Sequence, residues 1–86
     1  DLQRLIFVET NCISVVVLKF VNIGIVYKRL NQLDNTIANY EKALELQKGN
    51  RDADLVEDLA ECYHLKHDYT NALKYYNEAL LTKKDD

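Results

Sequence analysis

The residue types best suited to chemistry gather in one stretch of the second half of the chain. Cys62, His64 and His67 are metal-binding types, and Asp58 and Glu61 supply carboxylates nearby. On a helix, positions 62 and 64 point about 200° apart, so both cannot bind one ion without a partner chain. The same geometry excludes Cys62 and His64 as a nucleophile and its base.

Asp58 and Glu61 lie one helical turn apart and imitate the carboxylate pair of an acid–base catalyst. No pocket signal accompanies them, so a solvated helix face is the simpler interpretation. A glycine-rich phosphate loop is excluded because Gly24 and Gly49 are the only glycines. We therefore predict that the protein is not an enzyme and uses no cofactor and no metal.

Composition and charge describe a short helical domain with an acidic second half. The 86 residues are 48% hydrophobic and contain no proline, which favours one globular helical domain with a small core. Residues 1–48 carry six basic and five acidic side chains, a net charge of +1. Residues 49–86 carry five basic and nine acidic side chains, a net charge of −4, which disfavours direct nucleic-acid binding. The start at Asp1 suggests a fragment.

The cysteines and the apolar run near the start bear on the cellular compartment. Cys12 and Cys62 are too few for a secreted domain built on disulfides. We expect two buried free thiols in a reducing, intracellular compartment, cytoplasmic or nuclear. The apolar run from Ile13 to Leu18 is interrupted by Lys19 and falls below the ~18 residues that a membrane span needs, so no membrane association is expected. It also lacks the layout of a signal peptide.

One spacing recurs through the chain. It separates Gly24 from Ala60, Tyr27 from Tyr63, Tyr40 from Tyr76 and Ala43 from Ala79, and in each case it is 36 residues. Within each unit, small and aromatic residues fall at helical spacing on both sides of a short polar break. A period of this size with two helical segments per unit is typical of a stacked helical repeat.

The elements that would position these residues are helices at about residues 2–11, 15–30, 34–48, 53–66 and 70–81. Ser14, Asp34 and Thr70 are N-cap types at three of the starts. Asn31 tolerates the left-handed conformation that ends helices. The β-branched run at 13–17 would suit a strand, but no partner strand exists, so we predict a helix there.

Small residues stand where paired helices must cross. Two helices joined by about four residues lie antiparallel and close, and their backbones approach to about 8–10 Å. Gly24 and Ala60 provide the space on the first helix of each pair, and Ala72 provides it on the second helix of the second pair. The predicted inward face of the last helix consists of Ala72, Leu73, Tyr76, Ala79 and Leu80.

Two aligned copies of one pattern carry a family resemblance. The first reads Phe20, Ile23, Gly24, Tyr27, Thr36, Tyr40, Ala43, Lys48, and the second reads Val56, Leu59, Ala60, Tyr63, Ala72, Tyr76, Ala79, Lys84. Over residues 17–84 this pattern resembles the tetratricopeptide repeat. Thr36 replaces the usual alanine, Lys48 and Lys84 replace the usual proline, and the period exceeds the family's ~34 residues. We place the two extra residues near 49–52.

The resemblance implies an all-α fold of antiparallel helix hairpins, stacked as a short right-handed solenoid of about five helices. Residues 1–86 would form a single unit, a fragment of a longer array. In this division, 1–14 is a helix of a preceding partial repeat, 15–50 is repeat one and 51–86 is repeat two.

The resemblance also implies a concave groove lined by the first helix of each pair. Its outward residues are Leu18, Val21, Asn22, Ile25 and Lys28 from the first copy, and Asp54, Glu57, Asp58 and Glu61 from the second, with His64 as a further candidate. One wall is mainly apolar and the other acidic, which favours a peptide or helix with apolar and basic residues. The alternative is that Val21 and Ile25 cover the preceding helix and the acids form a solvated face.

The implied function is a non-catalytic protein–protein interaction module or scaffold in a larger multi-subunit assembly. About three repeats are usually needed for stability, so self-association through exposed repeat ends is also expected. A regulatory sensor domain that binds a short signalling peptide is the alternative. Chaperone-binding members clamp a terminal carboxylate with Lys and Asn; Asn22 occupies such an Asn position, but Asp54 and Asp58 would repel that ligand.

Overall fold

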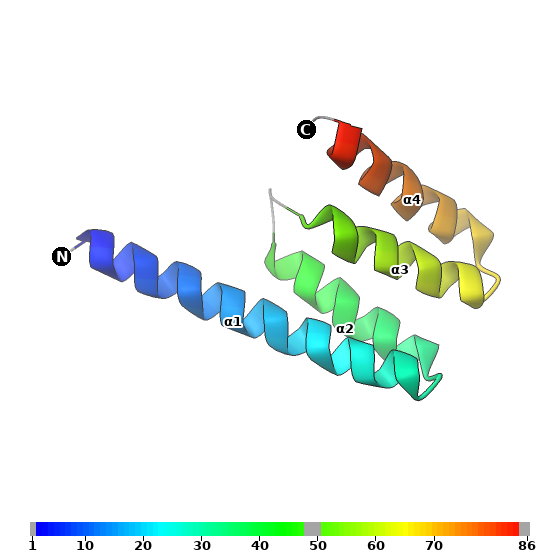
Figure 1. The fold of residues 1–86 in the computed structure, drawn as a ribbon, viewed down its shortest axis with the longest axis horizontal. Coiled ribbons are helices and arrows are strands. Elements are labelled where there is room, and N and C mark those ends of the chain that lie inside the picture. The colour runs from blue at the N-terminus through cyan, green and yellow to red at the C-terminus, as the bar shows by residue number, and fades with distance from the viewer. Residues whose placement is uncertain (1, 48–50, 85–86) are drawn as a thin grey trace.

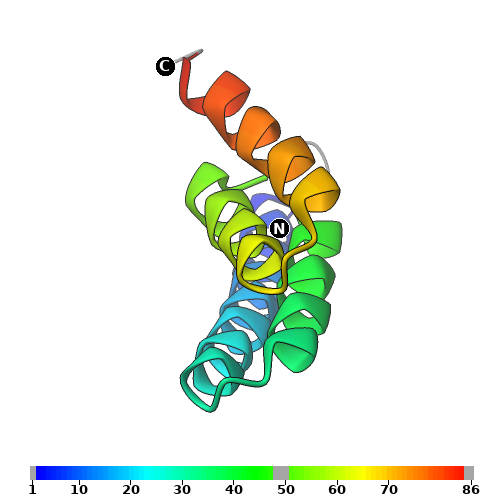
Figure 2. The ribbon, with the colours of Figure 1, turned by 90° about the vertical axis from the view of Figure 1, so that its right-hand side faces the viewer.

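The computed structural model describes the backbone of residues 2–47 and 51–84 and the side chains of residues 15–47 and 51–83. Four α-helices occupy these ranges: α1 (Leu2–Arg29), α2 (Leu33–Leu46), α3 (Ala53–Leu65) and α4 (Tyr69–Lys84). Consecutive helices run antiparallel, and each packs on the next (Figure 1). Viewed from the end, α1 and α3 lie on one side of the stack and α2 lies on the other (Figure 2). The predicted all-α stack of helix hairpins is confirmed.

The first helix is longer than the sequence predicts. α1 continues for 28 residues through Asn11 and Ser14, where we expected a break and a new N-cap. Neither residue type ends a helix by itself, because each costs only roughly 0.5 kcal/mol in a helix interior. The β-branched segment 13–17 is helical, as predicted. The described ranges therefore hold four helices, because the first two expected helices form one.

Both hairpins close with the same backbone geometry. Asn31 has φ 61° and His67 has φ 68°, so each takes the left-handed conformation that ends a helix, as predicted for Asn31. The hydrogen bonds that close the turns run from the Gln32 N–H to the Tyr27 carbonyl and from the Asp68 N–H to the Tyr63 carbonyl, both 2.9 Å. Every residue of one turn lies 36 positions from its counterpart, so the sequence period is also a structural period.

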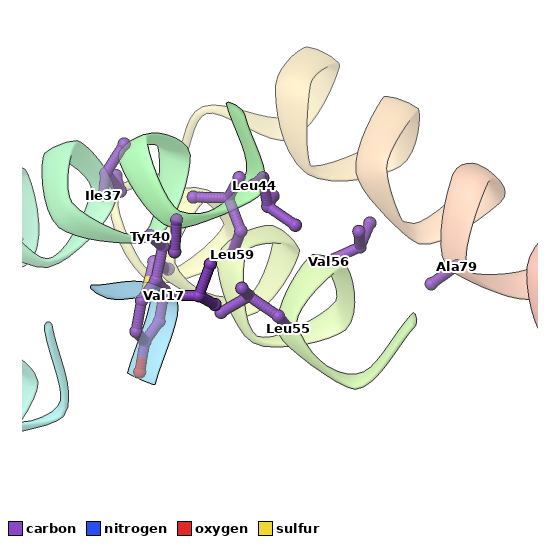
Figure 3. Close-up of a cluster of buried hydrophobic side chains, with 10 residues drawn as sticks. Val17, Ile37, Tyr40, Leu44, Leu55, Val56, Leu59 and Ala79 are labelled. Atoms are coloured by element: carbon purple, nitrogen blue, oxygen red, sulfur yellow. The ribbon is translucent and has the colours of Figure 1, made fainter. Parts of the chain in front are cut away.

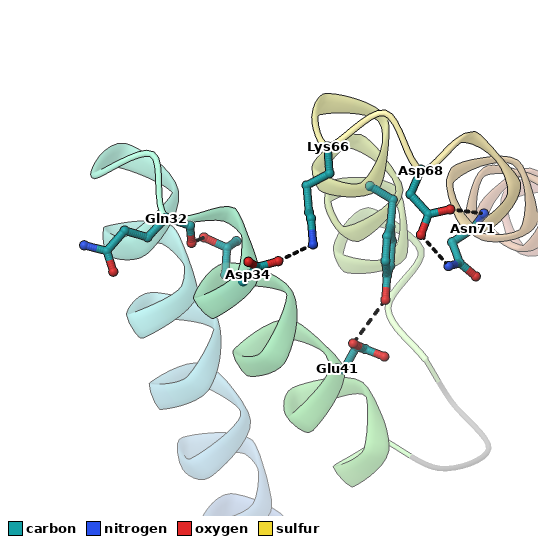
Figure 4. Close-up of polar contacts among 8 residues, drawn as sticks. Gln32, Asp34, Glu41, Lys66, Asp68 and Asn71 are labelled. Carbon is teal, nitrogen blue, oxygen red and sulfur yellow. Dashed lines mark hydrogen bonds and ion pairs between the residues drawn. The ribbon is translucent and has the colours of Figure 1, made fainter.

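The boundaries of α2 differ from the prediction. Its N-cap is Gln32, which makes no side-chain capping hydrogen bond, so Asp34 lies inside the first turn. There the Asp34 carboxylate forms an ion pair with Lys66 at the end of α3 (Figure 4). The Asp34 carboxylate is therefore paired with the Lys66 ammonium group instead of capping the backbone N–H groups of α2. α2 ends at Leu46, and the expected stop at 49–50 lies outside the described residues.

The start of α4 also differs from the prediction. The helix begins at Tyr69, so Thr70 is inside the first turn and is not the N-cap. Asp68 takes that role: its carboxylate accepts the Asn71 backbone N–H at 3.4 Å and the Asn71 side-chain amide at 2.8 Å (Figure 4). An ionised carboxylate at a helix start also interacts favourably with the helix dipole.

The core lies where α1, α2 and α3 meet (Figure 3). Its largest fully buried side chains are Tyr40, Leu59, Val56, Thr36 and Cys62. Thr36 is the one buried polar residue among the described side chains, and its hydroxyl donates to the Gln32 carbonyl at 3.1 Å. The substitution of Thr for the family's Ala therefore leaves no unsatisfied polar group in the core.

The predicted inward face of α4 is only half correct. Ala72 and Ala79 are buried and Tyr76 is half-buried, but Leu73 and Leu80 are exposed. The reason is that α4 packs on α3, and nothing within the described ranges packs on its other side.

Candidate functional site

The α1 wall of the predicted groove presents apolar and polar side chains to solvent. Leu18, Asn22 and Ile25 follow one another at helical spacing and are exposed. Val21 lies on the edge of this surface, half-buried, and packs against the core. Val21 therefore packs on the core, while Ile25 remains accessible.

The α3 wall is acidic from Asp54 to Glu61. Asp54, Glu57, Asp58 and Glu61 are all exposed. The helix start that carries them is fixed by Asp52, whose carboxylate accepts the Asp54 backbone N–H at 2.9 Å. Spacings of three and four residues place the four carboxylates on one side of α3.

One ion pair connects the two walls. The Lys28 Nζ on α1 lies 2.9 Å from the Glu61 Oε1 on α3. Partial burial lowers the pKa of Lys28, but the hydrogen bond to Glu61 and the nearby carboxylates outweigh this effect, so the pKa is raised overall. Both side chains are partly exposed, so the pair contributes at most about 1 kcal/mol.

Asp58 stands beside this pair in an unfavourable setting for a charge. Partial burial raises the pKa of its carboxyl, and the charges of Glu61, Glu57 and Asp54 raise it further, while Lys28 lowers it. No ion pair to Asp58 occurs among the side chains of 15–47 and 51–83. A cation brought by a ligand would therefore relieve this repulsion.

Sequence reasoning missed Lys83, which lies beyond the last helix predicted at 70–81. The Lys83 Nζ lies 3.4 Å from the Asp54 Oδ1 and also forms an ion pair with Glu57. The contact joins the end of α4 to the start of α3. No spacing in the sequence relates these residues, because the contact depends on how two antiparallel helices align.

The cysteine and histidines considered for chemistry lie in different surroundings. Cys62 is fully buried, and burial raises the pKa of its thiol. His64 is exposed, with its ring edge-on to those of Tyr69 and Tyr76 at centroid distances of 5.6 and 6.5 Å. The Nδ1 of His67 lies 3.0 Å from the Tyr69 hydroxyl. No group of three potential metal ligands is found in the part of the chain that the structure describes.

Helix hairpins that recur at a fixed period are typical of several helical repeat families. A family model described as tetratricopeptide repeat matches residues 16–80. The chain belongs to the tetratricopeptide-repeat family. A comparison with curated proteins finds no match.

Membership of the tetratricopeptide-repeat family places the chain in a fold that mediates protein–protein interaction rather than catalysis. Stacked repeats of this kind present extended concave surfaces to their partners. Across residues 2–47 and 51–84, no helix has both the length and the apolar character to cross a bilayer.

Proposed function

We propose that this tetratricopeptide-repeat chain is a scaffold that binds a partner peptide or helix between α1 and α3, as part of a larger multi-subunit assembly. The proposal rests on one observation: an exposed apolar wall, with Leu18 and Ile25, stands beside an exposed acidic wall, with Asp54 and Asp58. Apolar side chains of the ligand would cover the first wall, and basic side chains would meet the second.

The charge balance of the groove supports a basic ligand. Four carboxylates line α3, and the two lysines that pair with them are Lys28 and Lys83, so four negative and two positive charges leave −2. A terminal carboxylate is less favoured as a ligand, because Asp54 and Asp58 would repel it although Asn22 is exposed.

The assignment of repeats and compartment belongs to the same proposal. Repeat one spans 15–50 and repeat two spans 51–86, supported by the matching turns at Asn31 and His67. We assigned 1–14 to a helix of a preceding repeat; residues 2–14 of this segment lie on the same helix as the start of repeat one, α1. A buried free thiol at Cys62 favours a reducing, intracellular compartment.

Peptide binding at increasing salt concentration tests the groove. A labelled peptide with alternating leucine and lysine should bind the wild-type chain and lose affinity with salt. Asp58→Lys and Asn22→Ala should weaken binding together, and Asp58→Lys alone should reduce the salt dependence. Glu45→Lys on α2 makes the same charge change at an exposed site away from the groove and should have little effect. Affinity that ignores both salt and Asp58→Lys would contradict the proposal.

A further inference from the structure

Tyr40 of α2 extends past α1 towards the proposed groove. Its ring lies against Gly24 of α1, which has no side chain in the way. Figure 3 shows the hydroxyl oxygen at the end of the ring that points away from α2. The side chain is 1% exposed, so the protein surrounds almost all of it.

The hydroxyl of Tyr40 stands among the charged groups of the groove. Burial raises the pKa of the phenol most, and the negative charge of Asp58 raises it further. Lys28 lowers this pKa and Glu61 raises it, so both groups are also near. Asp58 and Glu61 lie on α3 and Lys28 lies on α1, so the phenol oxygen lies between these two helices, at the floor of the groove. The raised pKa keeps the phenol neutral at physiological pH.

No hydrogen bond of the Tyr40 hydroxyl is found within the ranges that the structure describes. Every fully buried polar atom among the side chains of 15–47 and 51–83 has a partner. The hydroxyl oxygen is therefore not fully enclosed, and the small exposed part of Tyr40 includes it. A phenol can both donate and accept a hydrogen bond, so this oxygen is available to a ligand from the groove.

Asp58 is the one carboxylate of the α3 wall without an ion pair among the described side chains. The other three are paired with lysines of α1 and α4: Glu61 with Lys28, and Asp54 and Glu57 with Lys83. The wall therefore has one place, between these ion pairs, where a carboxylate lacks a cation.

Ile25 supplies an apolar contact at the same level of the groove. Because consecutive helices are antiparallel, α1 and α3 run in the same direction (Figure 1). Lys28 is paired with Glu61, so Ile25 and Asp58, each three residues earlier, lie at one level along the groove. Ile25 is exposed. A long basic side chain would cover Ile25 with its methylene groups and bring its charged end to Asp58.

We propose that Asp58 and the Tyr40 hydroxyl form a subsite for one basic side chain, lysine or arginine, of the bound partner. The Asp58 carboxylate pairs with the charged group, and the Tyr40 oxygen accepts a hydrogen bond from the same group. This inference rests on the proposed groove. It adds the number of cations that the ligand needs, which is one, and a contribution from α2 to a site built on α1 and α3.

Two labelled peptides test the subsite on the full chain. Both consist of leucine and serine, and the central residue is lysine in one and norleucine, which keeps the methylene groups without the charge, in the other. By fluorescence anisotropy at low salt, the lysine peptide should bind about tenfold more tightly. Equal affinities would overturn the subsite.

A third peptide with three lysines tests whether the subsite takes a single cation. It should bind less than about threefold more tightly than the peptide with one lysine, because the other carboxylates of the wall already have lysine partners. A further gain of about tenfold for each added lysine would show a diffuse acidic surface and overturn the single subsite.

Matched variants of α3 assign the carboxylate. Asp58→Asn should remove the preference for the lysine peptide over the norleucine peptide. Glu57→Gln removes one negative charge from the neighbouring position, which is paired with Lys83, and should change this preference by less than about twofold. Circular dichroism of both variants establishes that they keep the fold. Equal effects of the two variants would overturn the role of Asp58.

A second pair of variants assigns the hydroxyl. Tyr40→Phe keeps the ring and should lower the lysine preference by about threefold, the effect of one lost hydrogen bond, without changing the affinity for the norleucine peptide. Tyr63→Phe removes a hydroxyl that is bonded to Glu41, away from the groove, and should change neither affinity. A lysine preference that Tyr40→Phe leaves intact would overturn the role of the hydroxyl.

The same measurements separate this inference from the proposed function. If the three-lysine peptide binds and loses affinity with salt, while Asp58→Asn and Glu57→Gln act equally, the groove stands and the subsite is overturned. If none of the peptides binds, the groove is overturned and the subsite with it.

Discussion

Gly24 of α1 lies directly against the aromatic ring of Tyr40 of α2. A Cβ atom added at Gly24 would lie 2.5 Å from the Tyr40 Cε1 and 2.7 Å from the Cδ1, distances that side chains do not tolerate. The ring is 1% exposed and is held in the core, so it has no free space to move into. The close approach of α1 and α2 therefore depends on the absence of a single methyl group.

The first prediction concerns this contact. Gly24→Ala should lower the free energy of unfolding by about 1–3 kcal/mol through overpacking, although alanine favours a helix by about 1 kcal/mol. Urea unfolding followed by circular dichroism measures the change. Gly24→Ala combined with Tyr40→Phe should remain destabilised because the ring is kept, whereas the combination with Tyr40→Leu should recover part of the loss. An increase in stability from Gly24→Ala would contradict the role of the contact.

The second prediction concerns the hairpin turns. His67 has φ 68°, a left-handed conformation that costs a residue with a Cβ about 1 kcal/mol. His67→Gly should therefore raise the free energy of unfolding by about 0.5–1 kcal/mol, less the contribution of its contact with Tyr69. Asn31→Gly should have a smaller effect, because asparagine tolerates this conformation better. Thermal unfolding of the two variants measures the difference, and a larger gain at Asn31 would refute the explanation.

The third prediction concerns Cys62. The thiol is fully buried, and burial raises its pKa, so the reactive thiolate is scarce in the folded chain. In a Cys12→Ser background, alkylation of Cys62 should be at least about a hundredfold slower than in urea-unfolded protein. The rate, followed by mass spectrometry, should rise with urea along the unfolding curve. A native rate equal to the unfolded rate would show that the core around α3 opens freely.

The fourth prediction concerns alkaline pH. Burial raises the pKa of Tyr63 to about 12, helped by the Glu41 carboxylate, which accepts the phenol hydrogen bond at 3.2 Å (Figure 4). An unfolded tyrosine titrates near pH ~10. The folded chain therefore favours the neutral phenol, and the stability this adds is complete below pH ~10 and lost as pH rises toward about 12.

Tyr40 and Tyr75 also have raised pKa values, mainly through burial, so they contribute to the loss of stability at alkaline pH as well. Comparison of the wild-type chain with Tyr63→Phe isolates the part that Tyr63 contributes. Urea unfolding at several alkaline pH values should show a shallower loss of stability for the variant. Below pH ~10 the variant should be less stable by about 0.5 kcal/mol, the value of a partly exposed hydrogen bond. Parallel curves for the two proteins would contradict the assignment.

Much of the fold follows from the sequence because small residues, aromatic residues and turn positions all recur with the same period of 36 residues. Gly24 and Ala60 are buried as expected for crossing points, and Asn31 turns the chain in the left-handed conformation. Such features are decided within a few residues or by one packing contact. Asp52, which was not among the predicted N-caps, shows that even local signals can be overlooked.

The features that the sequence did not predict depend on competition between helices. Asp34 was expected to cap α2, but Lys66 of α3 attracts its carboxylate. Lys83 approaches the acids of α3 because of the alignment of two antiparallel helices, which no spacing along the chain encodes. The proposed groove residues are a different matter: their placement on α1 and α3 was predictable from periodicity, but their use by a ligand depends on a molecule outside the chain.

The two hairpin turns share their hydrogen bonds but not their side chains: Leu30, Asn31 and Gln32 stand where the second turn has Lys66, His67 and Asp68. The hydrogen bonds that the two bends share come from main-chain atoms, so the same bend forms with different side chains at these three positions. Sequence divergence should therefore erase the similarity between the two turns sooner than the similarity between the helices. A common ancestor of the two repeats would then be traced through helix residues such as Tyr27 and Tyr63.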